Sequence, residues 1–195
     1  MLLQRGERQV NRTIQGILHS FGTLLERASY CQLTVSDITA QADIGRSTFY
    51  RHFSSKLEVL VLMHKGLFGQ MLQGYQTADD WLQDSAPASL GDFIHRFSRS
   101  DKLRRQLKYT LGADGDQAER QIARQMSAQL ISRLDENFKQ SAFVLPLANL
   151  AAAIEANIRA QLTMVTLHNG ENRAASLAQQ IHTLNKGLIL AALAK

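Results

Sequence analysis

The sequence of 195 residues contains few of the residues that cross-link a chain or interrupt a helix. It has one cysteine, two prolines and six valines, against 28 leucines. A single cysteine excludes an internal disulfide framework and a thiolate-rich zinc site. The Leu-rich, Val-poor composition favours helices over sheets. The longest apolar runs are far shorter than a membrane span, and the first ten residues lack the apolar core of a signal peptide. We therefore expect an all-α cytoplasmic protein with no membrane partner.

Motifs for metal or phosphate chemistry are also missing. The sequence has neither a GxxxxGK[ST] phosphate loop nor an HExxH motif, and its six histidines are scattered without the spacing of metal ligands. Cys31 precedes the most informative segment, where a small packing residue and a redox-sensing thiol are the alternatives. We therefore expect neither an enzyme nor a metal site, and no cofactor other than an unidentified small-molecule effector.

Positive charge is concentrated in two places. The net charge is +5, and residues 1–68 hold eight Lys or Arg residues against five Asp or Glu residues. This excess permits an anionic partner such as nucleic acid. The block Arg96–Lys108 is also basic. Such a block is typical of a solvated helix face, and a contact with DNA phosphates or with an acidic effector is the alternative.

Apolar residues recur at helical spacing along most of the chain. The pattern predicts helices over about 7–28, 55–77, 88–97, 100–111, 116–141, 147–168 and 171–194, with a loop over 77–89. Two short helices are predicted between the first two of these. Thr34 with Asp37, and Ser55 with Glu58, have the spacing of capping boxes.

The segment Leu33–Leu60 carries the strongest functional signal. Two short capped helices joined by a tight turn are typical of a helix-turn-helix. The second helix is polar on one side, whereas Phe49, and Phe53 just beyond it, can pack inward. A recognition helix needs this division, because short polar and Arg side chains near its N-terminus read base edges.

The run TV-DI---A-I---TFY-HF-SK-E-L resembles the DNA-binding domain of the tetracycline-repressor (TetR) family. The resemblance extends from the first helix to the fourth. Asp43 stands in the turn where the family usually has Gly, and Gly45 replaces a common small hydroxyl residue. Asp tolerates the left-handed backbone better than most residues do. The matching residues are Thr34, Val35, Asp37, Ile38, Ala42, Ile44, Thr48, Phe49, Tyr50, His52, Phe53, Ser55, Lys56, Glu58 and Leu60.

The resemblance implies a role for each polar residue of this segment. Residues at the start of the first short helix would touch phosphate, and those at the start of the second would face the major groove, with Arg46 contacting guanine. A packing role for His52 and a plain surface charge for Arg51 are the alternatives. The implied DNA-binding residues are Thr34, Ser36, Arg46, Ser47, Thr48, Tyr50, Arg51, His52 and Lys56.

The resemblance also implies two domains, with the DNA-binding domain over 1–54 and an effector-binding and dimerisation domain over 55–195. The helix over about 55–77 would link them. The apolar stripes of the last two helices are long enough to form a four-helix bundle with a second copy; the alternative is that they complete a monomeric core. The dimerisation candidates are Leu150, Ile154, Ile158, Leu162, Leu177, Ile181, Leu184 and Leu188.

Effector contacts are predicted more broadly, from apolar and amide side chains along the second domain. The candidates are Trp81, Phe93, Phe97, Leu107, Tyr109, Met126, Leu130, Phe138, Asn157, Gln161 and Met164. The sequence thus predicts a homodimeric transcriptional regulator, a ligand-responsive repressor of an inverted-repeat DNA operator. The alternative is a helical protein-interaction module without specific DNA binding.

Overall fold

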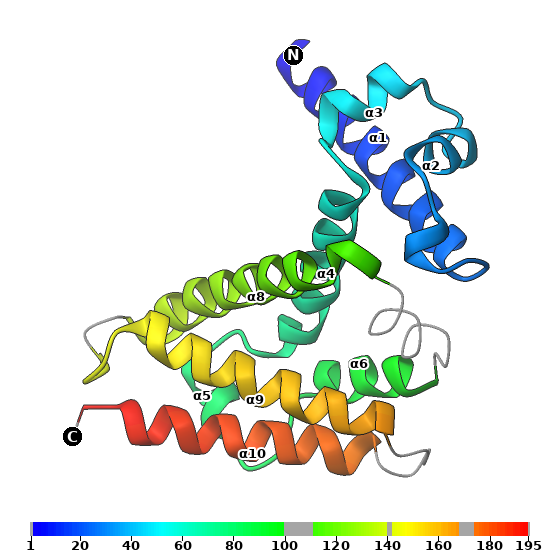
Figure 1. Ribbon diagram of the computed structural model, residues 1–195. Helices are drawn as coiled ribbons and strands as arrows, with labels where there is room; N and C mark the ends of the chain where they lie inside the picture. Colours follow the sequence, from blue (N-terminus) through cyan, green and yellow to red (C-terminus); the bar gives the residue numbers. More distant parts are fainter. Residues whose placement is uncertain (1, 100–110, 140–141, 168–173, 195) are drawn as a thin grey trace. The chain divides into compact units, whose positions relative to one another are not determined.

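The computed structural model describes residues 2–99, 111–139, 142–167 and 174–194 (Figure 1). Within these ranges the secondary structure is helical, apart from one isolated bridge between Phe143 and Leu193. The all-α prediction is confirmed. The chain forms two compact units: an N-terminal unit of residues 1–64 with 105–119, and a C-terminal unit of residues 65–104 with 120–195. The domain boundary expected at residue 54 stays a prediction.

The N-terminal unit is built around the long helix α1. Phe21 of α1 and Phe49 of α3 are completely buried, and the Phe21 ring meets the Tyr30 ring edge to face at 6.3 Å between centroids. Burial of these aromatic side chains, together with aliphatic residues such as Ile17 and Ile38, stabilises the unit. Its elements are α1 (Leu2–Leu25), the 3₁₀ turn η1 (Tyr30–Gln32), α2 (Val35–Gln41), α3 (Arg46–His52), the start of α4 (Lys56–Met71), η3 (Gly112–Asp114) and the start of α8.

The C-terminal unit is a helical bundle with one continuous apolar core. In it α10 packs against α5, α6 and α9 (Figure 1). The core is rich in Leu, Ile and Ala, with Trp81 and Tyr75 as its largest members. Its elements are the rest of α4, η2 (Leu72–Gly74), α5 (Ala78–Leu82), α6 (Ala88–Arg99), the rest of α8 (Gly115–Phe138), α9 (Leu147–Leu167) and α10 (Ala174–Ala192).

Helix α4 is shorter than the sequence predicts, and Gly74 explains its end. The α-helix stops at Met71 and continues as the 3₁₀ turn η2. A Cβ atom on Gly74 would lie 2.5 Å from Cβ of Pro87, closer than any real contact, so only glycine fits there. The Gly74 amide donates to Oγ of Ser89 at 2.9 Å. This contact fixes the start of α6 against the end of η2.

The loop predicted over 77–89 contains a helix, so that prediction was wrong. Thr77 caps α5: its Oγ1 accepts from the Asp80 amide, and the Asp80 carboxylate accepts from the Thr77 amide at 2.7 Å. The polar composition of the segment favoured a loop, although this capping box has the same Thr-x-x-Asp spacing as the one at Thr34. The helix predicted over 100–111, and the helix end expected at Asn169–Gly170, lie outside the described residues.

The turn between α2 and α3 has the left-handed backbone that the sequence suggested. Asp43 has φ of 50°. Its amide donates to the Ala40 carbonyl at 3.3 Å, and the next amide, of Ile44, donates to the Thr39 carbonyl at 3.0 Å. Asp is among the few residues other than Gly that adopt this conformation without large strain. No helix within the described ranges is both long enough and apolar enough to cross a bilayer.

We predict that the turn tolerates Gly but not a β-branched residue. Asp43→Val should lower the free energy of unfolding by about 1–2 kcal/mol, because Cβ branching clashes with the left-handed backbone. Asp43→Gly should change it by less than about 1 kcal/mol. Urea unfolding at one fixed protein concentration measures both. Gln41→Val, in the adjacent helical turn and exposed, is the control; an equal loss in Gln41→Val and Asp43→Val would contradict a role for the backbone conformation.

Candidate nucleic-acid interface

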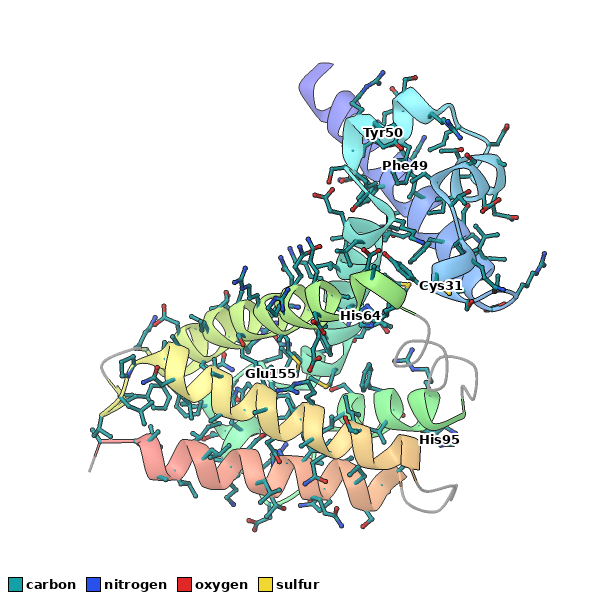
Figure 2. The ribbon with its side chains drawn as sticks, in the orientation of Figure 1. Cys31, Phe49, Tyr50, His64, His95 and Glu155 are labelled. Atoms are coloured by element: carbon teal, nitrogen blue, oxygen red, sulfur yellow. The ribbon has the colours of Figure 1, made fainter. Side chains whose placement is uncertain are left out.

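Helix α3 presents one polar, exposed side and one buried side. Phe49 is completely buried and Phe53 is 5% exposed, with their rings 5.7 Å apart, so both belong to the core as predicted. Tyr50 points outward and is 57% exposed (Figure 2). The remaining candidates on α3 and next to it fall into two groups: Arg46, Ser47 and Arg51 are exposed, and Thr48 and His52 are half-buried.

Helix α2 begins with a complete capping box, as the sequence predicts. Oγ1 of Thr34 accepts from the Asp37 amide at 3.2 Å, and Oδ2 of Asp37 accepts from the Thr34 amide at 2.8 Å and from the Thr34 hydroxyl at 2.7 Å. These hydrogen bonds lower the pKa of Asp37. The Thr34 hydroxyl is therefore donated inside the chain, and what this helix start can offer a phosphate is its remaining backbone amides.

Helix α3 begins differently, because its N-cap residue has no side chain. Gly45 makes no side-chain cap, which leaves the first amides of α3 without that partner. The backbone at Gly45 is extended, with φ of −73° and ψ of 153°, and a Cβ there would meet only Oγ of Ser47 at 3.7 Å. A hydroxyl residue would therefore fit at this position, so the glycine is not required by space.

Arg46 joins the two helices of the motif. Its Nη2 donates to Oγ of Ser36, so a side chain from the first turn of α2 holds the guanidinium at the start of α3. Both residues are candidates from the sequence, and the structure brings them together. A guanidinium has five N–H donors, so this bond leaves others for a base edge or a phosphate.

Lys56 lies where α4 begins, and its ammonium is bonded to backbone carbonyls. Nζ donates to the carbonyl oxygens of Tyr30 at 2.9 Å and of Leu33 at 2.8 Å, and it lies 4.3 Å from the centroid of the Tyr30 ring. The sequence assigns Lys56 to DNA phosphate. The structure shows that two of its three N–H donors are used within the N-terminal unit. Sequence reasoning missed this contact, because Tyr30 and Leu33 belong to a segment with no helical periodicity.

The dimerisation candidates lie mostly in the chain's own core. Five of them, Leu150, Ile154, Ile158, Leu177 and Ile181, are at most 8% exposed and belong to the core of the C-terminal unit. They therefore cannot form a direct contact surface for a partner. Periodicity identifies the apolar side of a helix but not what covers it, and here α5, α6, α9 and α10 cover one another. Leu162 and Leu188 are half-buried, and Leu184 is 48% exposed.

The effector candidates fall into three groups. Trp81, Phe93, Met126 and Leu130 are buried in the C-terminal core, with Phe138 packed beside them. Asn157 and Gln161 are half-buried on α9, where the Asn157 amide donates to Oδ1 of the buried Asn185 at 2.8 Å. The side chains of Phe97, Leu107, Tyr109 and Met164, and much of the basic block Arg96–Lys108, lie outside the described residues.

The buried His182 of the C-terminal unit has hydrogen-bond partners that the sequence does not indicate. Nε2 of His182 lies 2.9 Å from the Gln83 carbonyl, to which it must donate, and its Nδ1 lies 3.0 Å from the Tyr75 hydroxyl, from which a neutral ring accepts. Burial raises the pKa of Tyr75. The Tyr75 ring in turn packs against the Trp81 ring in a tilted arrangement, with 4.1 Å between the centroids.

Comparisons with known proteins agree with the geometry of the N-terminal unit. Residues 23–63 match the family of bacterial regulatory proteins called the tetR family. An uncharacterised HTH-type transcriptional regulator of Bacillus subtilis (strain 168), YxbF, is 40% identical over 58 residues. This match covers 29% of this chain and 15% of that protein, so the chain corresponds to a small part of its relative's length.

Solved structures share the fold of the whole chain. A TetR transcriptional regulator of Streptococcus agalactiae 2603V is 20% identical with a TM-score of 0.54, and the alignment covers 94% of this chain and 98% of that one. A protein of Syntrophomonas wolfei str. Goettingen, assigned to the TetR-family transcriptional regulators, is 17% identical with a TM-score of 0.58, over 92% and 96% of the two chains. The helix-turn-helix segment of the chain thus matches the tetR family of bacterial regulatory proteins, and the chain shares its fold with these two solved structures.

Proposed function

We propose that the protein is a sequence-specific DNA-binding transcriptional regulator that reads duplex DNA with α3. The observation that carries the proposal is that α3 has one buried and one exposed side. Phe49, and Phe53 just after the helix, are buried, whereas Arg46, Ser47 and Tyr50 are exposed. A major-groove reader needs such a face.

The roles follow from chemistry and position. Arg46, at the first turn of α3, has the guanidinium that contacts guanine, while Ser47 and Thr48 are short enough to approach base edges. The exposed hydroxyl of Tyr50 and the charge of Arg51 suit phosphate oxygens, together with the free amides at the start of α2. His52 is half-buried and contributes a backbone contact from its outer edge.

We propose that the protein acts as a homodimer on an inverted repeat, with α9 and α10 meeting the second copy. The outer side of α9 carries exposed alanines at i, i+4 spacing beside the exposed Arg159, and these alanines are Ala148, Ala152, Ala156 and Ala160. The outer side of α10 carries the half-exposed Leu184 and Leu190, with Gly187 between them. The exposed positions of α10 are uncharged, and charged residues are depleted at the core of protein–protein interfaces. A two-fold axis would then place two α3 helices about 34–36 Å apart, one turn of DNA.

We also propose that a small effector in the C-terminal unit controls DNA binding, as a repressor that releases its operator. Two buried donors, the Trp81 indole N–H and the Gln129 side-chain amide, have no hydrogen-bond partner in the part of the chain that the structure describes. Buried donors are nearly always satisfied, so an effector with acceptor oxygens suits this interior. An effector that binds better to a conformation with wrongly spaced α3 helices shifts the population away from DNA.

A selection from random duplex DNA at near-physiological salt tests the proposed function. Specific recognition by a dimer should enrich an inverted repeat, whose two halves lie about one helical turn apart. Weak binding that depends only on salt, with no enriched sequence, is the behaviour of non-specific electrostatic attraction. That outcome would support a helical protein-interaction module instead.

Arg46 is predicted to carry base recognition. Arg46→Ala should weaken operator binding by about 1–3 kcal/mol and relax the preference at one base pair of each half-site. Titrations of operator and single-base variants, followed by fluorescence anisotropy, measure both effects. Arg124→Ala, which removes an exposed arginine from α8, is the matched control. A loss of affinity that is equal for all sequences would assign Arg46 to phosphate.

Leu184 is predicted to lie in the dimer interface. Leu184→Glu brings two like charges together across the two-fold axis, and like-charge contacts cost several kcal/mol. The dimer should therefore dissociate at concentrations roughly tenfold or more above those of the wild type. Sedimentation equilibrium measures this, with Ala128→Glu on the exposed side of α8 as the control. An unchanged dimer would move the interface away from α10.

A further inference from the structure

The turn η3, just before α8, contacts the helix-turn-helix from a distant part of the sequence. The Tyr30 hydroxyl donates to Oδ2 of Asp114 at 2.7 Å, although the two residues are 84 positions apart. Gly112, with φ of 57°, lies beside the neighbour of Tyr30: a Cβ on Gly112 would lie 3.6 Å from Cβ of Cys31. The turn η3 is therefore docked on η1 through Gly112 and Asp114 on one side and Tyr30 and Cys31 on the other.

Tyr30 is buried and can only act as a donor toward Asp114. It is 1% exposed. Burial, the hydrogen bond and the negative charge of Asp114 all raise the pKa of Tyr30, so its hydroxyl keeps its proton at neutral pH. A neutral hydroxyl that donates to a carboxylate forms a charge-assisted hydrogen bond, which is stronger than one between neutral groups.

Tyr30 connects Asp114 to Lys56. The ammonium lies 4.3 Å from the centroid of the Tyr30 ring, a cation–π distance. Donation of the hydroxyl proton toward a carboxylate adds electron density to the ring, so the two contacts strengthen each other. The same ammonium holds the carbonyl oxygens of Tyr30 and Leu33. Leu33 immediately precedes Thr34, the N-cap of α2.

We propose that Asp114 is a positioning residue for the DNA-binding surface: through Tyr30 and Lys56, it fixes where α2 begins. The inference rests on the proposed DNA-binding function and adds to it a residue from outside the helix-turn-helix. A surface that is held in place before it meets DNA loses less entropy on binding. Asp114 immediately precedes α8, whose later residues belong to the C-terminal unit.

The test compares operator DNA with a random-sequence duplex of equal length. Asp114→Asn and Tyr30→Phe each remove the charge-assisted hydrogen bond and keep the size of the side chain. Each should weaken operator binding roughly tenfold, within the usual range of coupling between sites. Affinity for the random-sequence duplex should stay unchanged, because that binding is electrostatic and depends little on orientation. The double variant should bind operator no more weakly than either single variant, since both remove one interaction.

The ratio of the two affinities separates positioning from loss of folding. A partly unfolded variant loses affinity for both duplexes by the same factor, because the competent fraction scales every binding constant. Asp116→Asn, an exposed carboxylate two residues further along, is the control for the charge change and should match the wild type.

Each outcome has one meaning. Lower operator affinity with an unchanged random-duplex affinity in both single variants supports the proposal. Wild-type ratios in Asp114→Asn and Tyr30→Phe, or an equal fall for both duplexes, overturn it and leave the proposed function standing. A wild-type protein that does not distinguish the selected operator from random DNA overturns the proposed function, and the positioning role with it.

Discussion

The ammonium of Lys56 organises the N-terminal unit because it joins three segments that no regular hydrogen-bond ladder connects. It lies at the beginning of α4, where a positive charge is disfavoured by the helix dipole. Two carbonyl oxygens and one aromatic ring compensate it. These contacts hold η1 and the residue before α2 against the start of α4. The two short helices of the motif, each of seven residues, are too short to be stable alone and depend on such tertiary anchors.

The polar groups of the motif are largely bonded to one another before any partner arrives. Thr34 and Asp37 satisfy each other at the start of α2, and Ser36 holds Arg46. A side chain that is already oriented loses less rotamer entropy on binding than a free one does. Arg46 keeps further N–H donors after its bond to Ser36. The hydrogen bond that orients Arg46 and the contacts that it would make with DNA therefore use different N–H donors.

The sequence predicted the N-terminal unit well because its signals are local. Capping boxes, alternating polar and apolar positions and a left-handed Asp43 depend on residues within about one turn of each other. The same local rule predicts α5 from Thr77 and Asp80, but the surrounding Asp, Gln and Ser residues favoured a loop. The contacts of Tyr30 with Asp114 and of His182 with Gln83 depend on chain packing. No spacing in the sequence encodes them, so they appear only in the structure.

The dimerisation candidates show where helical periodicity stops being informative. A stripe of Leu and Ile marks the side of a helix that must be buried, and α9 and α10 use theirs for the core of their own unit. The side that is left outside includes small residues such as Ala152, Ala156 and Gly187, beside the exposed Arg159 of α9. Small exposed residues such as alanine and glycine add little to the hydrophobic periodicity of a helix, yet they allow two helices to approach closely. A contact surface of this kind is therefore identified only after the buried side of each helix is known. That step requires the fold.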